Sequence, residues 1–140
     1  MKTTKKFYRA MAVELNETGN KVLRSLVVAG KYRLAYRKGS WTKAIDGSAG
    51  ITGFKYIVDA MHRGMVELPD CKKRGCVAVE IWQCDAVLSA DQYPPAISVD
   101  YRFRLNPRGD TNFPWPKLTI FADAVRPIKC IARIEIERPI

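Results

Sequence analysis

Hydrophobic and polar residues alternate in several short runs of the chain, and glycine, proline or asparagine separates most runs from the next. A period of two is typical of a strand that buries one face. Strands are therefore predicted over residues 6–15, 21–29, 31–38, 77–82 and 97–105, around Leu118 and Ile120, and over residues 128–137. The run over residues 77–82 is apolar on both faces, which indicates a central strand. Clusters of Asn and Gly predict turns over residues 16–20 and 106–110.

One segment has the period of a helix instead. Four apolar residues recur there at i, i+3, i+4 and i+7, namely Phe54, Ile57, Val58 and Met61. This spacing predicts an amphipathic helix over residues 52–63, ended by Gly64, with the apolar stripe in the core. Strands and helix together predict an α+β fold: a strongly twisted, mostly antiparallel sheet or half-barrel of six or seven strands with one short helix. With 140 residues and no linker-like stretch, a single domain over residues 1–140 is expected.

The charge is concentrated in the first third of the chain. The protein carries a net charge of +10; residues 1–43 hold eleven basic and two acidic residues, whereas the remainder is close to neutral at +1. A basic segment of this kind favours a polyanionic or acidic partner: nucleic acid, a nucleoprotein complex or an acidic protein. No apolar run approaches the ~20 residues of a membrane span, and no apolar signal-peptide region follows the basic start. No membrane contact and a cytoplasmic location are therefore expected.

Aromatic residues are interleaved with the cations of this basic segment. In proteins that bind single-stranded nucleic acid, cations contact phosphates and aromatic rings stack on bases. The predicted binding residues are Lys5, Lys6, Arg9, Lys31, Arg33, Arg37, Lys38, Trp41 and Lys43. The Gly- and Ser-rich segment over residues 39–50 is predicted to be a long loop that carries the specificity. Trp41, near its start, would either stack on a partner or fill the core beneath the helix.

The candidate metal ligands are four cysteines and one histidine: Cys71, Cys76, Cys84, Cys130 and His62. Without a signal peptide, reduced thiols are expected rather than disulfides. Cys71 and Cys76 have a C-x4-C spacing that could hold zinc, completed by His62 and Cys84, in a zinc-stabilised interaction module. The alternative is a turn over residues 73–75 flanked by two small apolar side chains, with Cys84 and Cys130 in the core. His62 is expected near the end of the helix, at the surface or as a cap.

The inventory of catalytic groups is small. A single histidine excludes mechanisms that need two, and no G-x-S-x-G, G-x-G-x-x-G or Walker motif is present. The expectation is a non-catalytic binding protein that takes no cofactor. One enzymatic alternative stays open, because Arg33, Ser48 and Glu80 follow the order in which ADP-ribosyltransferase-like folds surround a nicotinamide dinucleotide. Glu80 lies in an apolar run, so it should have either a raised pKa or a cationic partner.

Four stretches resemble a pattern found in a loose group of small uncharacterised phage and bacterial proteins. They are Tyr36-Arg37-Lys38-Gly39-Ser40-Trp41-Thr42, Gly50-Ile51-Thr52-Gly53-Phe54 with a helix that carries Ala60, Glu80-Ile81-Trp82-Gln83-Cys84, and Val125-Arg126-Pro127. The resemblance spans residues 36–127 and implies a shared fold and a phage-like or mobile-element context, without implying an activity. In that context the protein would act in the host cytoplasm, in host takeover or as an inhibitor of host defence.

Overall fold

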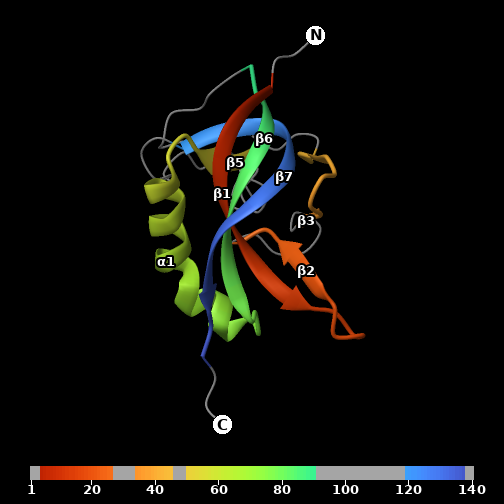
Figure 1. Ribbon diagram of the computed structural model, residues 1–140, viewed down its shortest axis with the longest axis vertical. Helices are drawn as coiled ribbons and strands as arrows, with labels where there is room; N and C mark the ends of the chain where they lie inside the picture. The colour runs from red at the N-terminus through yellow and green to blue at the C-terminus, as the bar shows by residue number, and fades with distance from the viewer. Residues whose placement is uncertain (1–3, 27–33, 46–49, 91–118, 138–140) are drawn as a thin grey trace, which may run out of the picture.

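The computed structural model describes residues 4–26, 34–45, 50–90 and 119–137. This part of the chain contains one helix and seven strands (Figure 1). The strands are β1 (Thr4–Leu15), β2 (Lys21–Arg24), β3 (Ala35–Tyr36), β4 (Thr42–Lys43), β5 (Ile51–Phe54), β6 (Ala78–Leu88) and β7 (Thr119–Glu135), and the helix is α1 (Ile57–Lys73). No helix of the described residues is long and apolar enough to cross a membrane.

Three long strands, β1, β6 and β7, form the framework of the fold. β6 lies between the other two and pairs antiparallel with both. β5 pairs with β7 on one side and, through Phe54 and Tyr8, with β1 on the other, so that β1, β6, β7 and β5 close a small ring of strands. β2 and β3 extend the sheet from β1, and β4 extends it from β7. The predicted α+β fold with a twisted, antiparallel sheet is confirmed, and Figure 1 shows the long strands curling around one another.

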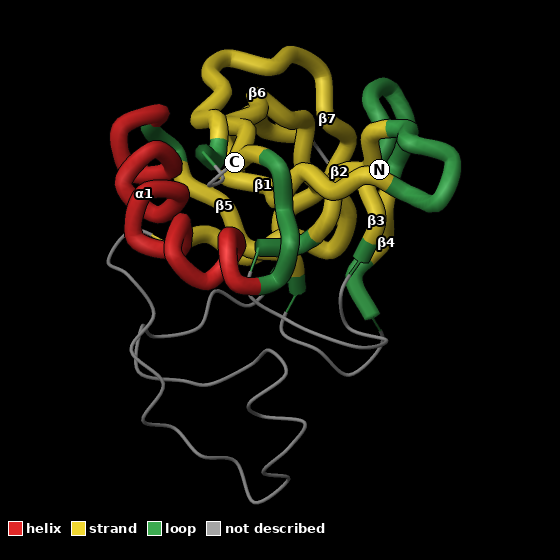
Figure 2. The backbone as a smooth tube through the Cα atoms, turned by 90° about the horizontal axis from the view of Figure 1, so that it is seen from below, coloured by secondary structure: helices red, strands yellow, loops and turns green. Residues whose placement is uncertain are grey.

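The two faces of the sheet bury two separate groups of apolar residues. The face enclosed by the ring of strands holds Phe7, Met11, Trp82, Cys84, Ala86 and Val125. The opposite face packs against α1 through Ala10, Ala12, Val79 and Ile81, and Figure 2 shows the helix along one side of the strands. Because successive side chains of a strand point to opposite faces, odd and even residues of β1 and β6 divide between the two groups.

The helix is longer than predicted. α1 continues through Gly64, where the sequence predicted its end, and through Pro69 as far as Lys73. A glycine ends a helix where the backbone takes a positive φ, and here that position is Gly75, with a φ of 87°. Pro69 removes one backbone donor from the helix, and the burial of apolar surface between α1 and the sheet compensates for that loss.

The buried face of α1 also differs from the prediction. The helix residues buried against the sheet are small: Ala60, Gly64 and Cys71. A Cβ atom added at Gly64 would lie 3.1 Å from Cγ1 of Val79 and 3.2 Å from Cδ1 of Ile81, so the helix backbone lies directly on β6. This close approach leaves no room for large side chains on that face. Of the predicted stripe, Phe54 is buried as expected, although it lies in β5, and Ile57 is half-buried, whereas Val58 and Met61 turn outward and are 69% and 39% exposed.

β1, β2, β3 and β6 each overlap a predicted strand, although β1 begins at Thr4 and β6 continues to Leu88, beyond the predicted ranges 6–15 and 77–82. The short strands β4 and β5 lie where a loop and the start of the helix were predicted. β7 joins two predicted strands through Pro127, which lacks an N–H and lies beside an irregularity in the pairing with β6, where proline is tolerated. The predicted strand over residues 97–105, the turn over residues 106–110 and Leu118 lie outside the described residues.

Candidate functional site

The described cations of the basic first third divide between different faces of the sheet. Lys5 and Lys6 are neighbours on β1 and therefore point to opposite faces of the sheet. Lys6 lies opposite Asp85 of β6, and Lys5 lies opposite Ala86. Of the other predicted cations, Arg37 and Lys38 are exposed between β3 and β4, whereas Lys31 and Arg33 lie outside the described residues.

Arg9 is a structural residue, and its predicted role at a binding surface is corrected by its burial. Its side chain is 8% exposed. The guanidinium donates to the backbone carbonyl of Thr52 at 2.5 Å and to Thr52 Oγ1 at 3.2 Å, and it lies 5.1 Å from the centre of the Tyr36 ring. These contacts tie β1 to β5 and β3, so Arg9 is not available to a partner.

One face of β6 brings cations together from both neighbouring strands. Lys6 of β1 and Arg126 of β7 lie on either side of Asp85 in the cross-strand register. Directly opposite residues of an antiparallel pair point to the same side, so the three charged side chains form a row. Arg126 donates to Oδ2 of Asp85 at 2.8 Å, whereas Lys6 forms no ion pair with any described residue.

Two more lysines share this face. Lys129 of β7 lies opposite Gln83, which is two residues from Asp85 on β6. Lys43 of β4 lies opposite Ala124, two residues from Arg126 on β7. Residues two apart on a strand point to the same side, and both lysines are exposed. We call the four cations on this side, Lys6, Lys43, Arg126 and Lys129, the basic face.

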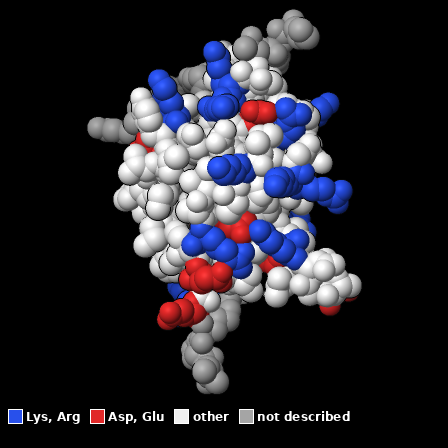
Figure 3. Space-filling model, viewed as in Figure 1, with Lys and Arg blue, Asp and Glu red and all other residues white. Residues whose placement is uncertain are grey.

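Basic side chains spread over the side of the molecule formed by β1, β6 and β7. Figure 3 shows them across this view, with acidic side chains mainly toward the end at which β7 stops. Sequence reasoning found Lys6 and Lys43 but missed Arg126 and Lys129, because the last two come from the part of the chain whose net charge is only +1. A regular strand through Pro127 would place these two residues, three apart in the chain, on opposite faces; the register shift in the pairing with β6 between Gln83 and Cys84 brings them to the same side.

Trp41 lies at the edge of the basic face and is not a core residue. Its side chain is 41% exposed, so the predicted alternative that it fills the core beneath the helix is wrong. The guanidinium of Arg126 lies 4.9 Å from the centre of the indole ring, within the range of a cation–π interaction. An exposed indole and four cations therefore share one surface.

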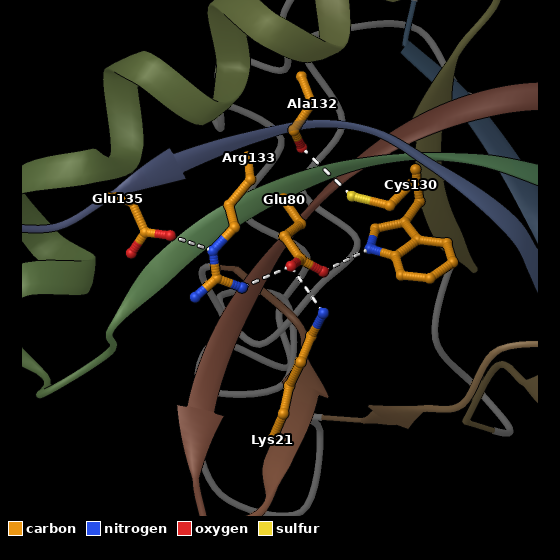
Figure 4. A network of polar contacts seen from close by, with 7 residues as sticks. Lys21, Glu80, Cys130, Ala132, Arg133 and Glu135 are labelled. Carbon is orange, nitrogen blue, oxygen red and sulfur yellow. Dashed lines mark hydrogen bonds and ion pairs between the residues drawn. The ribbon is translucent and has the colours of Figure 1, made fainter.

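Glu80 is the centre of a second charged group, near the other end of β6. Its side chain is only 2% exposed. Figure 4 shows Lys21 of β2 and Arg133 of β7 converging on its carboxylate, and both donate to Oε2 at 2.7 Å. Oε1 accepts from the indole Nε1 of Trp82 at 2.9 Å. Both carboxylate oxygens are thus occupied by donors from three strands.

The expectation that Glu80 has a raised pKa or a cationic partner is met by two cations. Burial by itself would raise the pKa of Glu80, but hydrogen bonds from Lys21, Trp82 and Arg133 stabilise the carboxylate and hold the pKa below its usual value of 4.5. The side chain is ionised at neutral pH and joins β2, β6 and β7. Arg33 and Ser48, which were grouped with Glu80 as an alternative transferase site, lie outside the described residues.

Cys71 and Cys76 are brought together by the end of α1. Gly75 donates its N–H to the carbonyl of Lys72 at 3.2 Å, and Cys76 donates its N–H to the carbonyl of Cys71 at 3.0 Å. These two bonds form a Schellman motif, in which the two residues five apart also contact each other through apolar side chains. Both cysteines are completely buried. The helix end therefore accounts for the C-x4-C spacing.

This cysteine pair has no further metal ligands in the part of the chain that the structure describes. No group of three or more His, Cys, Asp or Glu side chains there could hold a metal ion. His62 is exposed within α1, more than two turns from its last residue, so it is not a cap. Burial, reinforced by Cys76, raises the pKa of the Cys71 thiol to about 12, so this buried side chain is a neutral thiol at neutral pH.

We expect the folded protein to melt at the same temperature with excess zinc and with excess chelator. Cys71→Ser should lower the melting temperature in both conditions, because a hydroxyl group would be buried in an apolar site at a cost of about 1–3 kcal/mol. Cys130→Ser is the matched control, since Cys130 is exposed, and it should melt like the wild type. A melting temperature that rises with zinc in the wild type, but not in Cys71→Ser, would establish a zinc site instead.

The remaining two cysteines differ from each other in environment. Cys84 is buried in the enclosed face of the sheet, as predicted, and burial raises the pKa of its thiol to about 12. Cys130 was predicted in the core and is exposed; it lies on β7 beside a register shift in the pairing with β6, which interrupts the regular alternation of the strand. All four cysteines are free thiols in this structure.

Comparison of the chain with models of protein families, with curated proteins and with solved structures gives no match. The function is therefore inferred from the residues of this chain and their geometry. Two groups of charged residues stand out in the described part of the chain: the exposed basic face with Trp41 at its edge, and the buried Glu80 with its two cationic partners. Only the first leaves its lysines without ion-pair partners in the described chain.

Proposed function

We propose that this protein binds nucleic acid through the basic face. The observation that carries the proposal is the convergence of Lys6, Lys43 and Lys129, each exposed and without an ion pair among the described residues, on one side of the sheet. They come from distant parts of the chain and meet only in the folded protein. Phosphates of nucleic acid are the polyanion that such a surface binds, with release of counterions.

The energetics of the sheet support a ligand rather than simple solvation. Like charges on neighbouring strands repel and destabilise the folded protein. Among the described residues, Arg126 is the one cation of the basic face that forms an ion pair, through its 2.8 Å bond to Asp85. A phosphate backbone would supply the missing negative charge for the three lysines. The phage-like context implied by the sequence resemblance would make viral or host nucleic acid in the cytoplasm the target.

Binding to labelled oligonucleotides, followed by fluorescence anisotropy from about 50 to 200 mM salt, tests the proposal. The affinity should fall steeply with salt, because each phosphate contact contributes a slope of about −0.7 to −0.9 to the logarithmic plot. Lys6→Gln combined with Lys129→Gln should weaken binding and reduce the magnitude of that slope by about 1.4–1.8.

The matched control removes the same number of charges elsewhere. Lys72 and Lys73 are exposed in the last turn of α1, shortly before the start of β6, whereas the basic face surrounds the opposite end of that strand. Lys72→Gln combined with Lys73→Gln should leave the salt slope unchanged. Absence of binding at about 50 mM salt contradicts the proposal, and equal losses in both double variants contradict the assignment to the basic face.

A further inference from the structure

Trp41 presents an exposed aromatic surface beside the lysines of the basic face. Tryptophan is usually well buried, yet this side chain is 41% exposed. Arg126 covers one face of the indole, with its guanidinium 4.9 Å from the ring centre. A flat ligand would therefore stack on the face of the ring away from Arg126.

The backbone around Trp41 is held in place on both sides. Gly39 donates its N–H to the carbonyl of Pro127 at 2.8 Å, and Thr42 pairs with Val125. Gly39 has a φ of 80°, a conformation that side chains other than glycine rarely adopt, so the turn before Trp41 depends on this residue. A ring that is already fixed loses little conformational entropy when a ligand stacks on it.

Because Arg126 is paired with Asp85, we expect Arg126 to have a different role from the three lysines of the basic face. Its carboxylate binds Arg126 at 2.8 Å and places a negative charge beside the guanidinium, which opposes a phosphate at that point. Arg126 is thereby held as the support of the indole ring. Phosphates are directed instead to the three lysines without an ion pair among the described residues: Lys43, two residues from Trp41 in the chain, Lys129 on a neighbouring row, and Lys6 on the far side of Asp85.

From this arrangement, and resting on the proposed function, we infer that the basic face selects single-stranded nucleic acid by stacking an unpaired base on Trp41. In a duplex both faces of each base are covered by its neighbours, so the indole has no base to stack on unless the duplex opens. In a single strand the base face is free while the phosphates reach the lysines. DNA and RNA share this chemistry.

Anisotropy titrations with 12-nucleotide oligo-dT, 12-nucleotide oligo-U and a 12-base-pair duplex at one salt concentration test the inference. The wild type should bind the single strands at least about 10-fold more tightly than the duplex. Trp41→Ala should weaken single-strand binding about 5- to 150-fold, the range for losing one stacked base, and change duplex binding less than about 2-fold. Trp41→Phe should retain most of the affinity, because it keeps an aromatic face.

The matched control is Tyr56→Ala. Tyr56 is also an exposed aromatic residue, at 52%, with a cation over its ring, since Lys55 Nζ lies 5.5 Å from the ring centre. It precedes α1 and is not on the basic face, so its loss should not alter binding. Oligo-dT and oligo-U carry the same test to DNA and to RNA, and the inference requires at least one of them to bind more tightly than the duplex and to lose affinity in Trp41→Ala.

Two results would overturn the inference, and they are distinguishable. If single strands and duplex bind equally and Trp41→Ala changes neither, the basic face still binds nucleic acid, but not through a stacked base. If no oligonucleotide binds the wild type, the proposed function fails and the inference fails with it. Thermal melting of Trp41→Ala should match the wild type to within about 2 °C, which separates lost stacking from lost folding.

Discussion

Replacement of Gly53 by alanine is expected to destabilise the protein by about 1–3 kcal/mol, a fall of roughly 3–10 °C in melting temperature for a domain of this size. A Cβ atom at this position would lie 2.5, 2.6 and 2.7 Å from Cε2, Cδ2 and Cζ of Phe7. Phe7 is completely buried in the enclosed face of the sheet, so its ring cannot move without displacing its neighbours. The direction of the stability change is informative, because inside a strand without such a clash alanine stabilises the folded protein by about 0.5–1 kcal/mol relative to glycine.

A double-mutant cycle identifies the cause of this loss. Phe7→Leu removes the ring edge that the new methyl group would meet, at the cost of a looser core. In the Phe7→Leu background, Gly53→Ala should therefore cost much less than in the wild type, by a coupling free energy of about 1 kcal/mol or more. Thermal or denaturant unfolding of the four proteins gives this value. An unchanged cost in the two backgrounds would exclude the clash with Phe7 as the reason.

Glu80→Gln is expected to destabilise the protein at neutral pH by about 2–3 kcal/mol. The carboxylate is 2% exposed and accepts from Lys21, Trp82 and Arg133. The amide would place a donor where three donors now converge. Lys21 and Arg133 are 45% and 37% exposed, so water can solvate both cations in the variant. The expected loss of stability is therefore smaller than for breaking a completely buried ion pair. Glu135→Gln is the control, because this 65% exposed residue is another partner of Arg133, and it should change stability little.

The loss of folding stability caused by Glu80→Gln should become smaller as the pH falls. The pKa of Glu80 in the folded protein lies below its usual value of 4.5, so the carboxylate adds stability that is complete above about pH 5 and is lost as the pH falls through the folded pKa. The difference in the free energy of unfolding between wild type and variant should therefore shrink toward pH 3. Urea titrations at pH 7, 5, 4 and 3 measure it, and a constant or growing difference would show that the charge of Glu80 is not what stabilises the sheet.

The local pattern of the chain predicted the central strands well. In β1 and β6 one face packs in the enclosed core and the other packs beneath α1, and the alternation of side chains follows directly from strand geometry. The turn over residues 16–20 was equally local: Asn16 Oδ1 accepts from the N–H of Thr18 and of Asn20, and Gly19 takes a φ of 82°. Structure that depends on contacts between residues close in the chain can be predicted from the local sequence.

The errors occurred where a distant segment decided the outcome. Gly64 is a helix residue because α1 lies against Val79 and Ile81 of β6, and no local signal distinguishes a packing glycine from one that ends a helix. The same close approach turned Val58 and Met61 outward. Pro127 stays within β7 because the pairing with β6 shifts beside it.

The candidate site divides in the same way. From the sequence alone came the strong excess of positive charge, the exposed role of Lys6 and Lys43, and the prediction that Trp41 is a stacking residue or a core residue. Only the tertiary structure shows that Trp41 is exposed rather than in the core and that Arg9 is buried. It also shows that Arg126 and Lys129 belong to the basic face. The physical reason is that charge and alternation are properties of neighbouring residues, whereas the face that a cation shares is set by the register between strands distant in the chain.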